Sequence, residues 1–158
     1  MTQAIEKPSP NVPRWLVRTI WVVHRAAYTV TRGRFGLRPA TDSQWGMLRL
    51  RTVGRKSGKE RVAIVGFIVD GPNLVTPAMN GWADPEPAWW LNLQVNPHAT
   101  LELPDGSSRA VTARAAAGDE RPRLWARFVD LQSSAFTNAS AATRSRETAL
   151  VIFEPHLG

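Results

Sequence analysis

From residue 47 onward, apolar residues recur at every second position in short segments, and this pattern most limits what the chain can fold into. In residues 47–53 the even positions Leu48 and Leu50 alternate with arginines. A period of two indicates a β-strand with one buried face. Turns rich in glycine and proline separate the segments. The pattern predicts strands at 47–53, 61–69, 73–78, 99–103, 109–114 and 150–153.

Two helices are predicted between these strands, at 88–95 and 119–131. Strands and helices do not alternate one by one, so nothing supports a doubly wound parallel sheet. We predict a mainly β, α+β fold built on a small antiparallel barrel. A chain of 158 residues is long enough to form such a core without metals or disulfides.

The segment before the strands has a helical pattern instead. The pattern predicts a helix at 13–31. On that helix, extended by one residue, four arginines fall within a stripe about 40° wide: Arg14, Arg18, Arg25 and Arg32. Arg18 and Arg25 interrupt the apolar run that a transmembrane helix needs. The helix either lies on an anionic membrane surface or packs on the domain with its arginines in water. We predict a tail and amphipathic helix at 1–31, a linker at 32–45 and the barrel domain at 46–158.

Charge is distributed unevenly along the chain. Residues 1–61 hold 13 Lys and Arg against 3 Asp and Glu, whereas residues 62–158 hold 7 against 10. A basic half suggests a polyanionic partner: nucleic acid, an anionic membrane or a phosphorylated cofactor. The chain has no cysteine, which excludes disulfides, thiolate metal sites and cysteine nucleophiles, and its three histidines are scattered. We therefore expect no metal.

The sharpest local motif runs from Thr52 to Arg61. Two glycines bend the backbone between two strands, and cationic and hydroxyl side chains surround them. Such a turn can direct backbone N–H groups, a guanidinium and an ammonium at one phosphate. It lacks the spacing of a P-loop, and a solvated basic hairpin turn is the more common structure for such a run, so this window alone favours that interpretation.

Tryptophan is frequent, and two tryptophans are adjacent. Trp89 and Trp90 would point about 100° apart on a helix, so we expect at most one to face the core. The other is then free to cover a planar ligand or a loop.

Four segments carry a family resemblance when they are taken in order: LRTVGRKSGKERV at 50–62, LVTPAMNG at 74–81, PAWWLNLQVNP at 87–97 and TALVIFEP at 148–155. With these spacings the chain resembles the deazaflavin-dependent nitroreductase family of actinobacteria, which are split-barrel oxidoreductases that use the reduced coenzyme F420. The likeness covers residues 46–155.

The resemblance implies a split β-barrel like that of FMN-binding proteins, with an N-terminal helix, and an F420H2-dependent reductase. Arg55, Lys56 and Ser57 would hold the phosphate and acidic tail of the coenzyme, and Arg61 would complete the grip. The other coenzyme contacts that the resemblance implies are Val62, Ala63, Val65, Pro77, Ala78, Met79, Asn80, Ala88, Trp89, Trp90 and Asn92.

The chain departs from the family pattern at two places. Asn80 stands where relatives commonly have lysine, and the segment before the last strand has no tyrosine. That segment would line the acceptor side with Phe136, Thr137 and Asn138. A quinone, or the activated C=C bond of an enone or coumarin-like lactone, is the expected hydride acceptor, and nitro compounds fit less well. The proton would come from solvent, Ser57 or Ser140.

Rival readings remain from other protein classes. A flavin mononucleotide- or heme-binding split barrel would share the fold. A basic nucleic-acid-binding barrel would interleave aromatic residues with cations on its strands, whereas here most tryptophans lie on predicted helices or loops. A membrane-tethered module without catalysis would depend on residues 1–31. The resemblance favours a cytoplasmic reductase, with peripheral membrane contact as an alternative, and no nucleic-acid partner.

Overall fold

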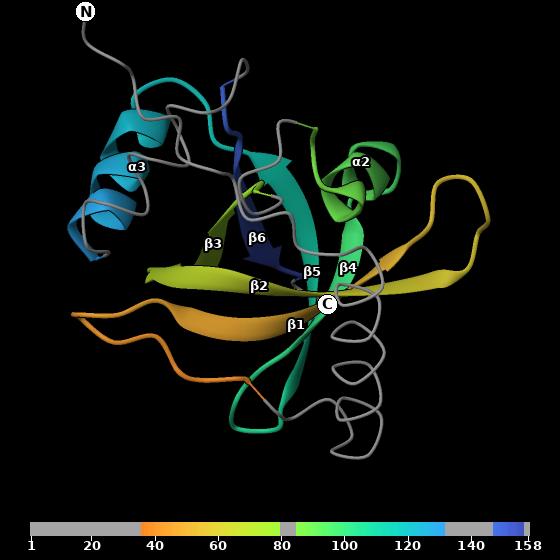
Figure 1. The fold of residues 1–158 in the computed structure, drawn as a ribbon, viewed down its shortest axis with the longest axis horizontal. Helices are drawn as coiled ribbons and strands as arrows, with labels where there is room; N and C mark the ends of the chain where they lie inside the picture. Colours follow the sequence, from red (N-terminus) through yellow and green to blue (C-terminus); the bar gives the residue numbers. More distant parts are fainter. Residues whose placement is uncertain (1–35, 80–84, 132–146, 157–158) are drawn as a thin grey trace, which may run out of the picture. The chain divides into compact units, whose positions relative to one another are not determined.

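Six strands close into an antiparallel barrel in the order β1-β2-β3-β6-β5-β4 (Figure 1). The computed structural model describes residues 36–79, 85–131 and 147–156. The strands are β1 (Gly46–Val53), β2 (Glu60–Asp70), β3 (Asn73–Pro77), β4 (His98–Glu102), β5 (Ser108–Ala115) and β6 (Leu150–Pro155). Helix α2 (Ala88–Val95) follows β3 along the chain, and helix α3 (Glu120–Leu131) follows β5. These bounds agree within two residues with the predicted strands and helices, so the predicted barrel is confirmed.

The alternation in β1 separates an apolar inner face from a charged outer face. Leu48 and Leu50 are fully buried inside the barrel. Arg49 and Arg51 lie on the outer face, where Glu102 of β4 pairs with both at 2.8 and 2.7 Å. The register of the two strands places Glu102 directly opposite Arg49. Both outer cations of β1 are therefore in ion pairs with this carboxylate of the neighbouring strand.

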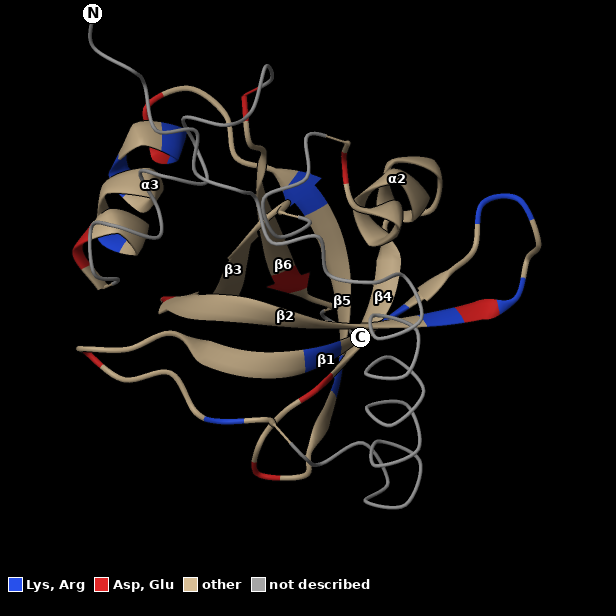
Figure 2. Ribbon diagram, in the orientation of Figure 1, with Lys and Arg blue, Asp and Glu red and all other residues tan. Residues whose placement is uncertain are grey.

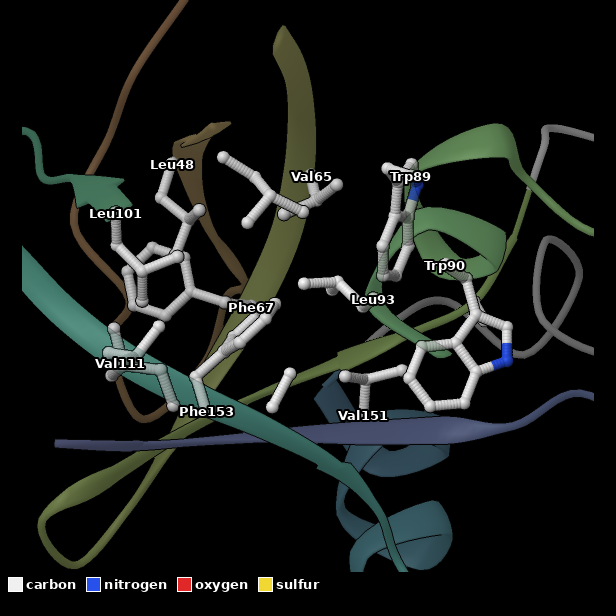
Figure 3. Packing of buried hydrophobic residues seen from close by; sticks show 14 residues of the cluster. Leu48, Val65, Phe67, Trp89, Trp90, Leu93, Leu101, Val111, Val151 and Phe153 are labelled. Atoms are coloured by element: carbon white, nitrogen blue, oxygen red, sulfur yellow. The ribbon is translucent and has the colours of Figure 1, made fainter. Parts of the chain in front are cut away.

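The inner core fills the barrel, and α2 packs against it (Figure 3). Its buried members are Leu48, Leu50, Val65, Phe67, Leu74, Ala78, Trp89, Trp90, Leu93, Leu101, Val111, Ala113, Val151 and Phe153. The expectation that at most one of the adjacent tryptophans faces the core is wrong, because Trp89 and Trp90 are 8% and 7% exposed. In Figure 3, Trp89 lies beside Val65 and Trp90 beside Val151, which belong to different strands. Two sides of α2 that diverge around the helix thus both meet the barrel.

A second, outer core joins α3 to the outside of the barrel. It consists of Trp45, Ile68, Val75, Leu124, Phe128, Leu150 and Ile152. The Trp45 ring meets the Phe128 ring edge to face, with 4.9 Å between centroids. The predicted amphipathic helix is confirmed by this one-sided burial, because Leu124 and Phe128 are its fully buried residues.

The loop before β1 folds back onto that strand. Arg38 and Met47 exchange two backbone hydrogen bonds, and Trp45 contributes the outer-core ring described above. The division of the chain at residues 31 and 45 stays a prediction, and the predicted helix at 13–31 lies outside the described residues. Neither helix in the described part of the chain is long and apolar enough to cross a membrane.

Candidate functional site

Residues 54–61, which we call the basic turn, connect β1 to β2 at the end of the hairpin. Gly54 donates its N–H to the carbonyl of Lys59 at 2.8 Å, and Gly58 donates to the carbonyl of Gly54 at 2.8 Å. Gly58 has a φ of 66°, a conformation that side chains disfavour. A Cβ atom on Gly54 would lie 2.9 Å from Ser57 Oγ and 3.2 Å from the Lys59 carbonyl oxygen, so a side chain there would displace Ser57 and crowd the backbone. A side chain at either glycine would therefore strain or shift the turn.

The side chains of the basic turn form an exposed cluster of positive charge. Arg55, Lys56, Lys59 and Arg61 are all exposed, and none has an ion-pair partner among the residues that the structure describes. The carboxylate next to them, Glu60, lies 3.5 Å from Arg51 instead. Figure 2 shows the blue turn projecting from the barrel. An unpaired group of cations of this kind favours a polyanionic ligand.

Ser57 lies within this cluster. Its Oγ atom accepts hydrogen bonds from the Lys59 backbone N–H and from Arg61 Nη2, both at 3.3 Å. The serine hydroxyl is exposed and its own proton remains available for donation. Ser57 was predicted as a coenzyme contact and as a proton donor; the structure places it beside Arg61, the other cation predicted to complete the grip, and both roles stay predictions.

Helix α2 is tied to the basic turn through Asn92. The Asn92 side-chain carbonyl accepts from the Arg55 backbone N–H at 3.1 Å and from Arg55 Nη1 at 3.3 Å. Its amide nitrogen donates to Thr52 Oγ1 at 3.2 Å. Both Asn92 and Thr52 are almost completely buried. Two segments that the sequence analysis described separately are thus joined in space.

The remaining predicted contacts are spread over different parts of the barrel and α2. Val62 is 40% exposed on the outer face, opposite Arg51 in the register of the hairpin. Ala63 packs against the inner core, and Val65, Ala78, Trp89 and Trp90 belong to it. Pro77 is buried, Met79 is half-buried against the outer core and Ala88 is exposed. Asn80, Phe136, Thr137, Asn138 and Ser140 lie outside the described residues.

Thr52, which accepts the hydrogen bond from buried Asn92, was not among the residues predicted for the site. It stands inside the quoted motif, but the family pattern gives it no function, and its inward direction follows from the same alternation that buries Leu48 and Leu50. No group of three or more metal-ligating side chains gathers among the described residues.

Comparisons with known proteins decide the family. The sequence model of the F420H2-dependent quinone reductases matches residues 21–155. The chain belongs to this family. A curated F420H2-dependent quinone reductase of Mycobacterium tuberculosis is 30% identical over 150 residues, which are 90% of this chain and 97% of that protein. A second protein of the same organism is 39% identical over 83 residues, covering 52% of this chain and 69% of that protein.

Solved structures agree on the fold. The structure of an F420H2-dependent reductase has a TM-score of 0.60 at 24% identity and covers 68% of this chain and 93% of that chain. A heme storage protein of Vibrio cholerae has a TM-score of 0.53 at 15% identity and covers 82% and 89%. The barrel is therefore the FMN-binding split barrel that was predicted.

Family membership makes the chain an F420H2-dependent reductase whose cofactor is reduced coenzyme F420. The resemblance stated from sequence is confirmed at this level. Family membership therefore favours F420 over flavin mononucleotide and heme, the two other cofactors that a split barrel could bind. The donor set of the basic turn fits the group, because exposed unpaired cations suit a ligand with a phosphate and an acidic tail.

Proposed function

We propose that the basic turn holds the phosphate and acidic tail of F420H2 while the reductase delivers a hydride to a quinone. The single observation that carries the proposal is the group of four exposed cations, Arg55, Lys56, Lys59 and Arg61, without ion-pair partners among the described residues. Six other arginines of the described chain, Arg49, Arg51, Arg114, Arg121, Arg123 and Arg127, are in ion pairs. Cations left unpaired on a hydrogen-bonded turn are suited to a ligand's negative charges.

Several features of the chain support an anion at this place. Arg55 presents a planar guanidinium that can form two parallel hydrogen bonds to a phosphate, whereas Lys56 and Lys59 act as point charges. Helix α2 begins at Ala88 and has no acidic residue in its first turn, so its positive dipole end can add to an anion site. Asn92 joins that helix to the turn. These groups would hold the charged end of the coenzyme and leave its ring to be oriented by β2 and β3.

The reaction itself needs little acid–base chemistry from the protein. Bound F420H2 supplies a hydride from C5 of its ring. Quinone reduction to the hydroquinone consumes that hydride and then a proton. Ser57, the other candidate from the sequence, lies among the cations proposed for the charged end of the coenzyme, so we take solvent as the source of this proton. The protein contributes position and electrostatics.

Acceptors other than quinones are a finer part of the proposal. The activated C=C bond of an enone or coumarin-like lactone shares the electron-poor, planar character of a quinone, and nitro compounds are the third class. The residues proposed for the acceptor pocket, Phe136, Thr137 and Asn138, belong to the undescribed part of the chain. A screen with menadione, cyclohexenone and a nitroimidazole separates the three classes.

Coenzyme binding tests the proposal directly. The purified protein is titrated into F420 while the fluorescence of the deazaflavin is followed, with Arg55→Ala/Lys56→Ala as the test variant. Each charge-assisted hydrogen bond contributes about 1.5–3 kcal/mol, so the double substitution should weaken binding about 100-fold or more.

A matched control removes one charge elsewhere. Arg109→Ala deletes an arginine of β5 that also has no ion-pair partner among the described residues, whereas Lys59→Ala deletes one charge from the basic turn. We expect only the second to weaken binding. Equal affinities of the wild type and the double variant would refute the basic turn as the site.

A further inference from the structure

Thr52 and Asn92 form a buried polar pair at the foot of the basic turn. Among the described residues, Thr52 is 3% and Asn92 is 4% exposed. They come from β1 and α2, and 40 positions separate them along the chain. Their hydrogen bond at 3.2 Å continues into the two bonds that Asn92 accepts from Arg55. The three side chains thus form one connected network.

The direction of each hydrogen bond in this network follows from chemistry. A guanidinium and a backbone N–H can only donate, so the Asn92 carbonyl oxygen must face Arg55. The amide nitrogen of Asn92 then faces Thr52, whose oxygen accepts. Both lone pairs of the Asn92 carbonyl are used by Arg55, which leaves this oxygen no capacity for a ligand. Asn92 therefore acts on a ligand through Arg55.

We propose that Thr52 and Asn92 are positioning residues that hold Arg55 in its binding conformation before the coenzyme arrives. This proposal rests on the proposed function of the basic turn. The hydrogen bond that Asn92 donates to Thr52 fixes the amide plane of Asn92. The Asn92 carbonyl in that plane then holds both the backbone N–H and one guanidinium nitrogen of Arg55. The guanidinium has five N–H donors, so the others remain available to an anion.

The physical advantage is preorganisation. An arginine side chain has many rotamers, and immobilising it upon binding weakens the affinity of a ligand. In this chain part of that ordering already occurs when the protein folds, because Arg55 is bonded to a buried amide. By contrast, no described side chain accepts a hydrogen bond from Lys56. Within the basic turn, Arg55 is thus the described cation whose side chain donates to a buried group, the Asn92 carbonyl.

The decisive substitution is Thr52→Val, which removes the hydroxyl and keeps the shape of the side chain. It should weaken F420 binding about threefold to tenfold, the effect of one lost hydrogen bond. Thr52→Ser restores the hydroxyl and should restore the affinity. Thr112→Val is the matched control, because the Thr112 hydroxyl contacts His156 at 3.4 Å on β5, a strand that β4 separates from β1. This control should leave the dissociation constant unchanged.

A double-substitution cycle separates positioning from a general structural defect. In the Arg55→Ala background, Thr52→Val should have a much smaller effect on the dissociation constant, because the guanidinium through which it acts is gone and only the backbone N–H bond of residue 55 to Asn92 remains. An equal loss in both backgrounds would overturn the proposal, as would wild-type affinity in Thr52→Val. Circular dichroism of each variant monitors folding, and Thr52→Ala is used in the same cycle should the valine variant fail to fold.

The outcomes also distinguish this proposal from the one on which it rests. Failure of the wild-type protein to bind F420 at low salt would refute the basic turn as the coenzyme site. Tight binding by the wild type together with unchanged binding by Thr52→Val would leave that site intact and refute only the positioning network.

Discussion

Two buried threonines of the barrel wall have hydroxyl groups in opposite situations. Thr52 on β1 accepts a hydrogen bond from Asn92, whereas the Oγ1 atom of Thr76 on β3 has no hydrogen-bond partner among the described residues. Thr76 is 1% exposed, so its hydroxyl has also lost contact with water. A buried polar group without a partner destabilises the folded state, and a paired group stabilises it modestly. The same substitution should therefore have opposite effects at the two positions.

We expect Thr76→Val to raise the free energy of unfolding by about 1 kcal/mol and Thr52→Val to lower it by about the same amount. Valine has the shape of threonine, so packing changes little in either variant. Urea unfolding followed by tryptophan fluorescence measures both. A loss of stability in Thr76→Val would mean that the hydroxyl has a partner, such as a buried water.

At the scale of elements, ion pairs at the first residue and along the middle of α3 fasten it to the barrel. Arg123 binds both carboxylate oxygens of Asp70 at 2.8 and 2.9 Å, and Arg127 adds a third bond at 3.0 Å. At the start of the helix, Glu120 accepts two bonds from Arg114, at 2.8 and 3.0 Å. Hydrogen bonding from Arg123 is the largest cause that lowers the pKa of Asp70; burial opposes it, and the charges of Arg123 and Arg127 lower the pKa further. Hydrogen bonding from Arg114 likewise lowers the pKa of Glu120.

These shifts predict acid sensitivity at the helix. When a carboxyl has a lower pKa in the folded state, the unfolded chain binds more protons in acid than the folded chain does, and the free energy of unfolding falls with the pH. Its stabilising contribution is complete above the ordinary values of 3.8 and 4.5 and is lost as the pH falls through the lowered pKa values. We expect Asp70→Asn to lower the free energy of unfolding at pH 7 and to reduce its decline between about pH 6 and pH 3.

Urea unfolding at both pH values checks this prediction. Asp119→Asn is a matched control, because Asp119 makes no ion pair with another described residue. Equal declines in the wild type and Asp70→Asn would show that the Asp70 ion pairs are too well solvated to matter.

At the scale of the whole molecule, the excess positive charge is concentrated in two segments of the chain. Ion pairs of the described residues lie on the outer face of β1 and the surface of α3, and the basic turn stays unpaired (Figure 2). The other basic segment is the predicted helix at 13–31, which lies outside the described residues. Gly36–Gly158 is a compact unit by its own contacts. Coenzyme binding and membrane contact can therefore be tested separately.

Deletion of residues 1–31 should leave F420 binding unchanged and abolish co-sedimentation with vesicles of anionic lipid, if the helix lies on membranes as one reading of the sequence predicts. Neutral lipid vesicles serve as the control. Equal sedimentation of the full chain and the truncated chain would refute membrane contact through this helix.

Much of the fold was predictable because it depends on local patterns. The alternation of Leu48 and Leu50 with arginines identified β1 and its buried face, and glycines marked the turn that follows. The cations of the basic turn were recognisable for the same reason, since they are neighbours in sequence. The cofactor depended on a family resemblance, because the phosphate-binding character of one turn does not distinguish F420 from other phosphorylated ligands.

The sequence by itself therefore determined the succession of strands along the chain, the inner face of β1 and the position of the cations in the basic turn. Only the tertiary structure decided that Asn92 reaches Arg55 across 37 residues, that Glu102 forms ion pairs with Arg49 and Arg51, and that adjacent tryptophans are both buried. The physical reason is that periodicity describes which way a side chain points from its own strand or helix. Which distant side chain it meets depends on how the barrel closes and where α2 packs, and these follow from the packing of the whole domain.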